Sequence, residues 1–224
     1  MEPCDARNRG DERADHRTAR RSGRNNALRA FIARRVITTG SSASDGCPWS
    51  QPRGPRRSVH FPSSLGLLPI EWEEAIGETG MGAPHNLHAV QAAMDLGQAV
   101  VVILAAEDRA GLLPELASSP EDATDLRLRG QSRQNVILEA GLAMGVDRDR
   151  TILVELGSIR RASDFDGLNT IRLTNSAPAR LALRDRLATA GCDVNEHGSD
   201  WTRSETGGDF EACAVPWSEI EVPL

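Results

Sequence analysis

Short runs of branched apolar residues alternate along the chain with longer stretches whose apolar residues recur every three or four positions. The first pattern is typical of strands buried on both faces of a parallel sheet, and the second of helices. QAVVVILAA is the clearest strand, because it is apolar throughout and does not alternate. The predicted strands are 68–72, 99–106, 151–157 and 170–173, and the predicted helices are 25–37, 84–96, 130–145 and 177–190.

Strands that alternate with helices predict a doubly wound α/β domain. In such sheets ligands bind beyond the carboxyl ends of the strands. The loops after Trp72, Ala106 and Gly157 are expected at that edge, and the charged, proline-containing segment 107–130 is predicted to be a loop. The start of the helix 130–145 is expected at the same edge.

The helix 130–145 is apolar or small at almost every position, so we expect it to be buried on most sides. Glu139 is the only charged residue between Arg133 and Asp147. A carboxylate on a buried helix is costly without a partner, and such groups gather where ligands bind. The alternatives are a salt bridge with an arginine or exposure through a gap, but the expected position of the helix start favours function. Asn135 is expected to cap that start.

The amino-acid composition limits the cellular compartment and the classes of partner that we expect. All 26 basic residues are arginine; residues 1–60 hold 13 of them against six acidic residues, and the remainder holds 13 against 26. The basic head, 1–22, has few large apolar residues, so we expect disorder rather than nucleic-acid binding. The four cysteines form no CxxC pair, which predicts neither a metal site nor a disulfide framework. No apolar run is long enough for a bilayer and no signal peptide is recognisable, so we expect a cytoplasmic protein without a membrane partner.

Several blocks together resemble one known family. PIEWEEAI, TGMGAP, QAVVVILAAED, GQSRQNVILEAGLAMG, RTILVELG and RLALRDRLATAGC are similar to the bacterial TIR-like family. That family is often labelled predicted nucleotide-binding protein, and its relatives include the TIR domains of TIR-STING and other cyclic-nucleotide-triggered phage-defence effectors. The resemblance runs from about Leu65 to Cys192, and its most specific block is NVxxEAGxAxG after GQxR.

The resemblance implies a flavodoxin-like TIR fold, with a parallel sheet of about five strands and helices on both faces. It also implies cleavage of NAD+, as substrate rather than cofactor, to nicotinamide and an ADP-ribose product, with Glu139 as the catalytic glutamate. The chemistry agrees with one carboxylate. Glycosidases need a second carboxyl group to protonate the leaving alkoxide, whereas nicotinamide departs as a neutral molecule. Glu139 would then hold ribose hydroxyls and stabilise the developing cation.

Further candidate substrate-binding residues follow from the same blocks, each with a simpler alternative. Arg133 matches the family block and would pair with the pyrophosphate, or form a surface salt bridge. Asn135 matches too, or is only a helix cap. Trp72 would stack on a ring, or belong to the core. Gly80 and Gly82 would make the loop after the second strand flexible, or are turn residues.

The N-terminal region departs from the family pattern. GRNNALRAFI resembles the family's His-Gly-Arg turn and helix, which makes Arg24 and Asn25 candidate substrate-binding residues, but the preceding RADHRTARRS is no strand. Residues 38–64 match nothing in the family. Three explanations compete: RRVITTG replaces the first strand, the reading frame is altered here, or the protein is a degraded copy. Matching segments flank the non-matching ones, which favours an altered frame.

The expected organisation is a disordered basic head (1–22), a TIR-like domain (23–192, with 38–64 as a loop or insertion) and a C-terminal tail (193–224). The main functional hypothesis is an NAD+ hydrolase of antiphage or stress signalling that acts when self-associated; no sensor for an activating signal is recognised. The alternatives are a non-catalytic nucleotide-binding or scaffold protein, and a nucleoside deoxyribosyltransferase-like enzyme with a glutamate nucleophile.

Overall fold

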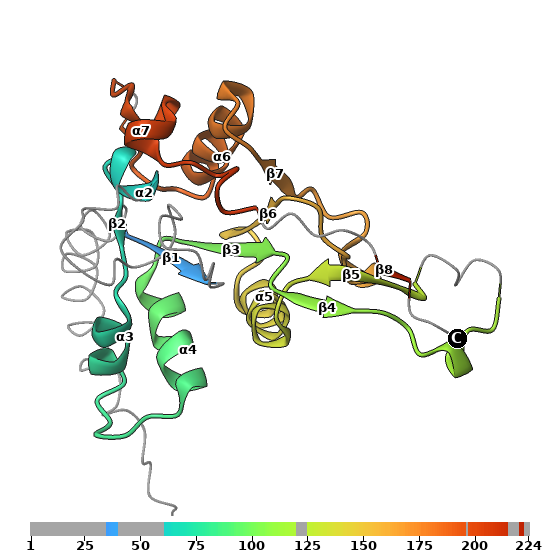
Figure 1. Cartoon of the computed structure of the whole chain (residues 1–224). Helices are drawn as coiled ribbons and strands as arrows, with labels where there is room; N and C mark the ends of the chain where they lie inside the picture. The colour runs from blue at the N-terminus through green and yellow to red at the C-terminus, as the bar shows by residue number, and fades with distance from the viewer. Residues whose placement is uncertain (1–34, 40–60, 120–124, 196, 215–219, 222–224) are drawn as a thin grey trace, which may run out of the picture.

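A five-stranded parallel sheet in the order β2-β1-β3-β6-β7 forms the centre of the molecule, and a small antiparallel ribbon, β4-β5-β8, extends beyond it (Figure 1). The computed structural model describes residues 35–39, 61–119, 125–195, 197–214 and 220–221. The strands are β1 Arg35–Thr39, β2 Leu68–Pro69, β3 Ala99–Ala105, β4 Asp108–Ala110, β5 Arg127–Gln131, β6 Thr151–Leu156, β7 Ile171–Leu173 and β8 Ile220–Glu221. This sheet order is that of the flavodoxin-like fold, as predicted.

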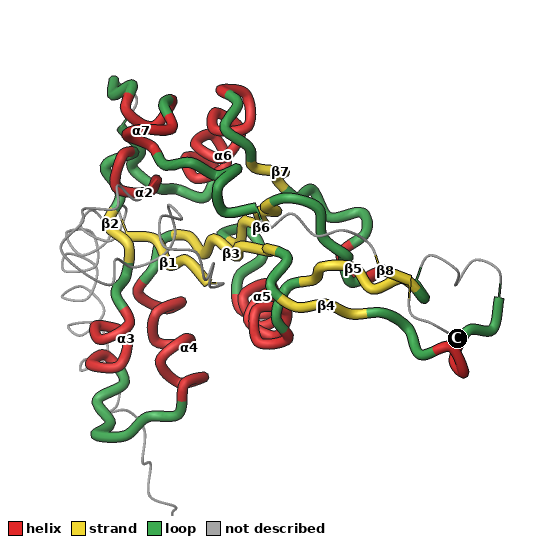
Figure 2. Tube along the Cα trace, in the orientation of Figure 1, coloured by secondary structure: helices red, strands yellow, loops and turns green. Residues whose placement is uncertain are grey.

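Helices cover both faces of the sheet (Figure 2). The helices are α2 Phe61–Ser64, α3 Trp72–Glu78, α4 Asn86–Leu96, α5 Gln134–Val146, α6 Ala177–Thr189 and α7 Ser204–Gly207, with 3-10 turns η1 Pro114–Leu116, η3 Ser163–Phe165 and η4 Asp200–Thr202. Val100, Val102 and Leu104 of β3 pack with α3, α4 and α5 on one face. Val101 and Ile103 pack with α2, α6 and the C-terminal segment on the other. No helix among the described residues is long and apolar enough to cross a membrane.

The first strand is present, next to the middle of the sheet. β1 pairs in parallel with β3, from Val36 opposite Ala99 to Thr39 opposite Val102, and it also pairs with β2. Arg35–Thr39 therefore provide the first strand of the sheet, and no altered reading frame is needed to complete it. The predicted helix 25–37 is wrong at its end, because the β-branched run VITT favours a strand. Arg24 and Asn25 lie outside the described residues.

Two further predictions need correction. The predicted strand 68–72 is reduced to the two residues of β2, because Pro69 offers no backbone N–H and acidic residues at the start of α3 favour a helix. The predicted loop 107–130 contains β4 and β5, which pair antiparallel. The sequence of β5, RLRGQ, is mostly polar, so its apolar pattern did not indicate a strand.

α5 is less buried than its composition predicts. Val136, Ala140 and Ala143 form one buried stripe, whereas Leu138 is 63% exposed and Val146 is 51% exposed. The helix packs mainly on β3. The apolar residues on its outer side face away from the core of this chain.

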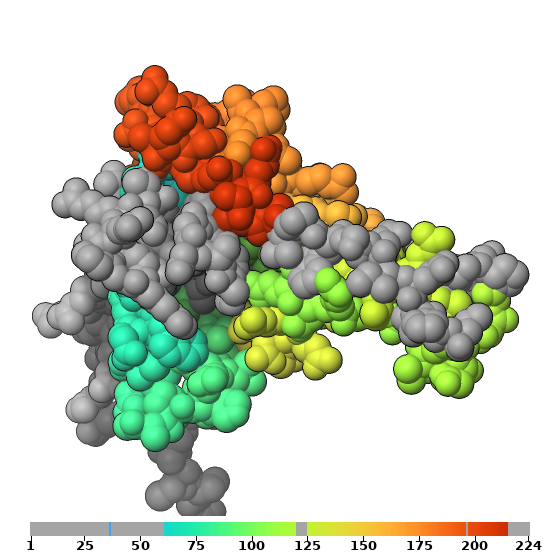
Figure 3. All heavy atoms as spheres, viewed as in Figure 1, coloured from blue at the N-terminus to red at the C-terminus, as the bar shows by residue number. Residues whose placement is uncertain are grey.

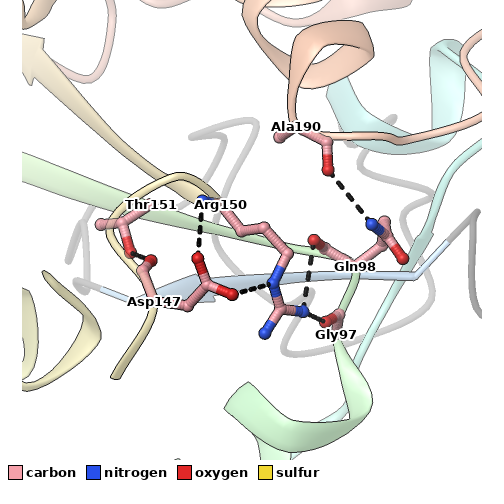
Figure 4. Close-up of polar contacts among 6 residues, drawn as sticks. All are labelled: Gly97, Gln98, Asp147, Arg150, Thr151 and Ala190. Atoms are coloured by element: carbon pink, nitrogen blue, oxygen red, sulfur yellow. Dashed lines mark hydrogen bonds and ion pairs between the residues drawn. The ribbon is translucent and has the colours of Figure 1, made fainter. Parts of the chain in front are cut away.

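A cluster of hydrogen-bonded polar residues links the chain segments just before β3 and β6 with the end of α6 (Figure 4). Arg150 lies in the turn before β6; its Nε contacts Asp147 Oδ2 at 2.7 Å, and its guanidinium also donates to the carbonyl of Gly97 at 2.7 Å. The hydrogen bonds to Arg150 lower the pKa of Asp147. Gln98 Nε2 donates to the carbonyl of Ala190 at 3.1 Å. The ends of α4, α5 and α6 are thereby fixed at this edge, and with them the direction of α5 towards the opposite edge.

The fully buried Arg180 of α6 holds the C-terminal segment 197–214 on the sheet. It donates to the backbone carbonyls of Asn175 (3.2 Å), Trp201 (3.1 Å), Gly207 (3.3 Å) and Gly208 (2.6 Å), and to side-chain oxygens of Asn175 (3.1 Å) and Ser204 (3.4 Å). Its guanidinium carbon lies 4.5 Å from the centroid of the Phe210 ring. Figure 3 shows this segment, in red, lying against α6, in orange.

We expect Arg180→Met to destabilise the protein by about 3–5 kcal/mol, because several buried carbonyls lose their donor at once. Urea unfolding gives the free energy, and limited proteolysis should cut the segment 197–214 in the variant first. Arg172→Met is the matched control, since Arg172 is exposed on β7. Equal losses in the two variants would contradict the role of Arg180.

Candidate functional site

Three chain segments meet beyond the carboxyl ends of β3 and β6. The backbone N–H of Glu107, after β3, donates to the carbonyl of Gln131 at 3.0 Å. The N–H of Arg160, after β6, donates to the carbonyl of Gly130 at 2.7 Å. The turn after β3, the entry into α5 and the loop after β6 are thus joined at the edge of the sheet where α/β domains bind ligands.

Glu107 is a buried carboxylate at this edge. Its side chain is 7% exposed, and neither oxygen has a hydrogen-bond partner among the described residues. Arg133 Nε lies 3.2 Å from Oε2, but this contact lacks hydrogen-bond alignment, and the Arg133 side chain is 50% exposed. Burial raises the pKa of Glu107; the charge of Arg133 opposes the rise and that of Asp108 adds to it.

Ser132 lies close to Glu107. The backbone N–H of Glu107 bonds the carbonyl of Gln131, and the Arg133 side chain contacts the Glu107 carboxylate, so Ser132 lies between two residues that touch Glu107. Ser132 is 4% exposed, and its hydroxyl has no hydrogen-bond partner among the described residues. A buried carboxylate and a buried hydroxyl therefore both lie at the entry to α5.

α5 begins at this point and carries Glu139. Its N-cap is Arg133, and no side chain caps it; Asn135 is an exposed residue of the first turn, so the predicted cap is wrong. Glu139 is partly exposed and lies beside the buried stripe that Val136, Ala140 and Ala143 form. It lies about 9 Å along the helix axis from Arg133, at a rise of 1.5 Å per residue. The helix start, with its free N–H groups, favours anions.

The structure does not bring Trp72, Gly80 and Gly82 to this edge. Through β1, Pro69 is level with Ala99 at the start of β3, six residue steps, or roughly 20 Å, from the end of that strand. Trp72 is 42% exposed at the start of α3, and α4 lies between α3 and α5 (Figure 1). Gly80, with φ +65°, and Gly82 lie in the loop between α3 and α4, and both have open space where a Cβ would be. Gly80 therefore serves a turn.

No motif or apolar pattern in the sequence marks Glu107, Ser132 or Arg160 as site residues. The available signal was position: Glu107 directly follows the most apolar strand, where a polar residue lies at the ligand-binding edge. Among the described residues, no three histidine, cysteine, aspartate or glutamate residues are grouped to hold a metal ion.

Comparison with known proteins identifies one family. The model for the TIR domain of CAP12/Pycsar effector proteins matches residues 58–175, more than half of the chain. The match includes Glu107, Arg133 and Glu139, and it begins after β1. No curated protein matches the chain.

Because burial raises the pKa of Glu107, the folded state holds this proton more tightly than the unfolded state. Stability is then present at low pH and falls as pH rises from about 4.3, the ordinary glutamate pKa, through the raised value. Glu107→Gln should remove this slope and raise the melting temperature at pH 7. Melting temperatures from pH 4 to 8 test this, with Glu73→Gln, an exposed glutamate on α3, as the control. An unchanged slope in Glu107→Gln would show that another group causes it.

Proposed function

Because the chain belongs to the TIR-domain family of CAP12/Pycsar effector proteins, we propose that it is a TIR-type NAD+ hydrolase that cleaves the bond between nicotinamide and ribose. The observation that carries this proposal is Glu139. This glutamate of the NVILEAG block is partly exposed on α5, which begins at the ligand-binding edge of the sheet. The proposed setting is antiphage or stress signalling.

One carboxylate is enough for this reaction. Water replaces nicotinamide at the anomeric carbon and gives up one proton to the solvent; nicotinamide leaves as a neutral molecule, so no acid must protonate it. The carboxylate of Glu139 binds ribose hydroxyls and balances the positive charge that develops on the ribose. Its incomplete burial leaves it accessible to a bound ligand.

The entry to α5 suits the diphosphate of the substrate. Arg133 is half-exposed, and its contact with Glu107 lacks hydrogen-bond alignment, so its guanidinium is available to a phosphate. The free N–H groups of the first turn, near Asn135, favour the same negative charge. Arg24 and Asn25 remain proposed substrate ligands on the strength of the resemblance alone.

Self-association is part of the proposal. TIR-like domains build composite sites between copies, and Leu138 and Val146 present apolar surface on α5. Trp72, Gly80 and Gly82 are exposed and distant from the Glu139 edge of their own chain, so their proposed roles belong to a site shared with a second copy. The complete sheet supports an active enzyme over a degraded copy.

Glu139→Gln keeps the shape of the side chain but removes its negative charge. Nicotinamide release from NAD+ should fall by roughly a hundredfold or more, in line with the loss of a preorganised electrostatic group. The melting temperature should change little. Glu73→Gln, an exposed glutamate on α3, is the matched control and should retain activity. Full activity with a lowered melting temperature would show that Glu139 is structural; base exchange between deoxynucleosides without nicotinamide release would indicate the deoxyribosyltransferase alternative.

If the active site is shared between copies, nicotinamide release per molecule should rise steeply with protein concentration, and crowding agents should have the same effect. Leu138→Asp should shift this rise to higher concentration, because it places a charge on exposed apolar surface of α5. Activity across a dilution series, with sedimentation to measure the oligomeric state, tests both. Constant specific activity in a monomer would rule out a shared site.

A further inference from the structure

Buried side-chain polar atoms without hydrogen bonds are rare in native proteins, and each needs a reason. Among the described residues, such atoms occur in Glu107, Arg129, Ser132 and Glu155. Arg129 and Glu155 have other good contacts: Arg129 bonds Asp125 at 3.2 Å, and Glu155 is held by Arg161 at 2.6 Å. In Glu107 both carboxylate oxygens lack a hydrogen bond, and in Ser132 the only side-chain polar atom does.

The two residues have complementary chemistry. A carboxylate only accepts hydrogen bonds and has room for several, whereas a hydroxyl both donates and accepts. Two adjacent hydroxyl groups of one ligand satisfy both oxygens of a carboxylate, and acidic residues of dinucleotide-binding folds hold ribose hydroxyls in this way. A phosphate group at the same position would face the carboxylate charge, with the exposed Asp108 adding to the repulsion.

We propose that Glu107 and Ser132 form the subsite for the adenosine ribose of NAD+, and that Glu107 selects NAD+ against NADP+. This inference rests on the proposed function. NAD+ carries two ribose diols, and Glu139 is assigned to the one at the bond that breaks. The other diol is left for Glu107, and Arg133 contacts Glu107 at 3.2 Å and lies about 9 Å along α5 from Glu139.

Arg133 links the two parts of this site. In the free protein its Nε contacts the Glu107 carboxylate. When the dinucleotide binds, the guanidinium turns to the diphosphate and the ribose hydroxyls take its place on Glu107. The Glu107 carboxylate is already removed from water in the free protein. Ligand binding therefore adds hydrogen bonds to it without a further desolvation cost.

The test compares ADP-ribose with 2′-phospho-ADP-ribose, which have no nicotinamide bond to break. Titration calorimetry on the full chain should show ADP-ribose binding at least tenfold more tightly than its 2′-phosphate. Glu107→Gln should weaken ADP-ribose roughly tenfold and bring the two affinities close together. Asp95→Asn, which removes an exposed negative charge from α4, should retain the preference. A purely structural role would change stability and leave the affinity ratio alone.

Three results would overturn the proposed subsite. They are an equal affinity ratio in wild type and Glu107→Gln, tighter binding of the 2′-phosphate by wild type, and no binding of either compound. Rates of nicotinamide release from NAD+ and NADP+ separate this inference from the proposed function. If both dinucleotides are cleaved equally by wild type and variant, the hydrolase stands and the subsite fails. If the binding preference appears without nicotinamide release, the subsite stands and the hydrolase fails.

Discussion

The fully buried guanidinium of Arg180 is the contact on which the packing of one whole face of the sheet depends. Burial lowers the pKa of Arg180, so its charge is tolerated only because carbonyl and side-chain oxygens surround it. Four of these oxygens belong to the C-terminal segment 197–214, so the segment and the charge require one another. The short α2 covers little of this face, and Trp201 and Phe210 complete the cover, with Phe210 in edge contact with Phe61 at 5.3 Å.

Two buried carboxylates near the carboxyl edge of the sheet differ in how well the fold balances their charge. Glu155 on β6 is 1% exposed; its Oε2 accepts a 2.6 Å hydrogen bond from Arg161, and its Oε1 lies 2.6 Å from Arg161 Nε, so its charge is balanced within the fold. Glu107, after β3, has one poorly aligned contact with a half-exposed arginine. Burial without matching hydrogen bonds destabilises the folded state. A residue that fails to stabilise the fold is the better candidate for a role in binding, and this comparison selects Glu107 over Glu155.

The sequence predicts elements that have a continuous or periodic apolar pattern of their own. It misses strands that form only by pairing with another strand. β3, β6 and α6 have continuous or periodic apolar patterns, and all were predicted within one or two residues. β1 was only one of three explanations, because five residues in a region without family similarity carry little pattern. β5 is polar and becomes a strand by pairing with β4. Glu139 was found from its block, whereas Glu107 and Ser132 were missed, because burial and an absent hydrogen bond are properties of the tertiary structure. The distance of Trp72 from the carboxyl edge was missed in the same way, since the register of β2 fixes its position.

The charged groups on α5 and at its start follow an order that matches the proposed substrate. Glu139 would meet the nicotinamide end, where the pyridinium is positive and the cation develops. Arg133, at the positive start of the helix, would meet the diphosphate. Glu107 would meet the adenosine ribose, which is uncharged in NAD+ and negative in NADP+. The helix can present this order only if its direction is fixed, and Arg150 fixes its other end through Asp147 and the carbonyl of Gly97. A reversed ligand would place the developing cation beside Glu107 and within reach of the Arg133 guanidinium, whose positive charge would oppose it; the proposed orientation would avoid this repulsion.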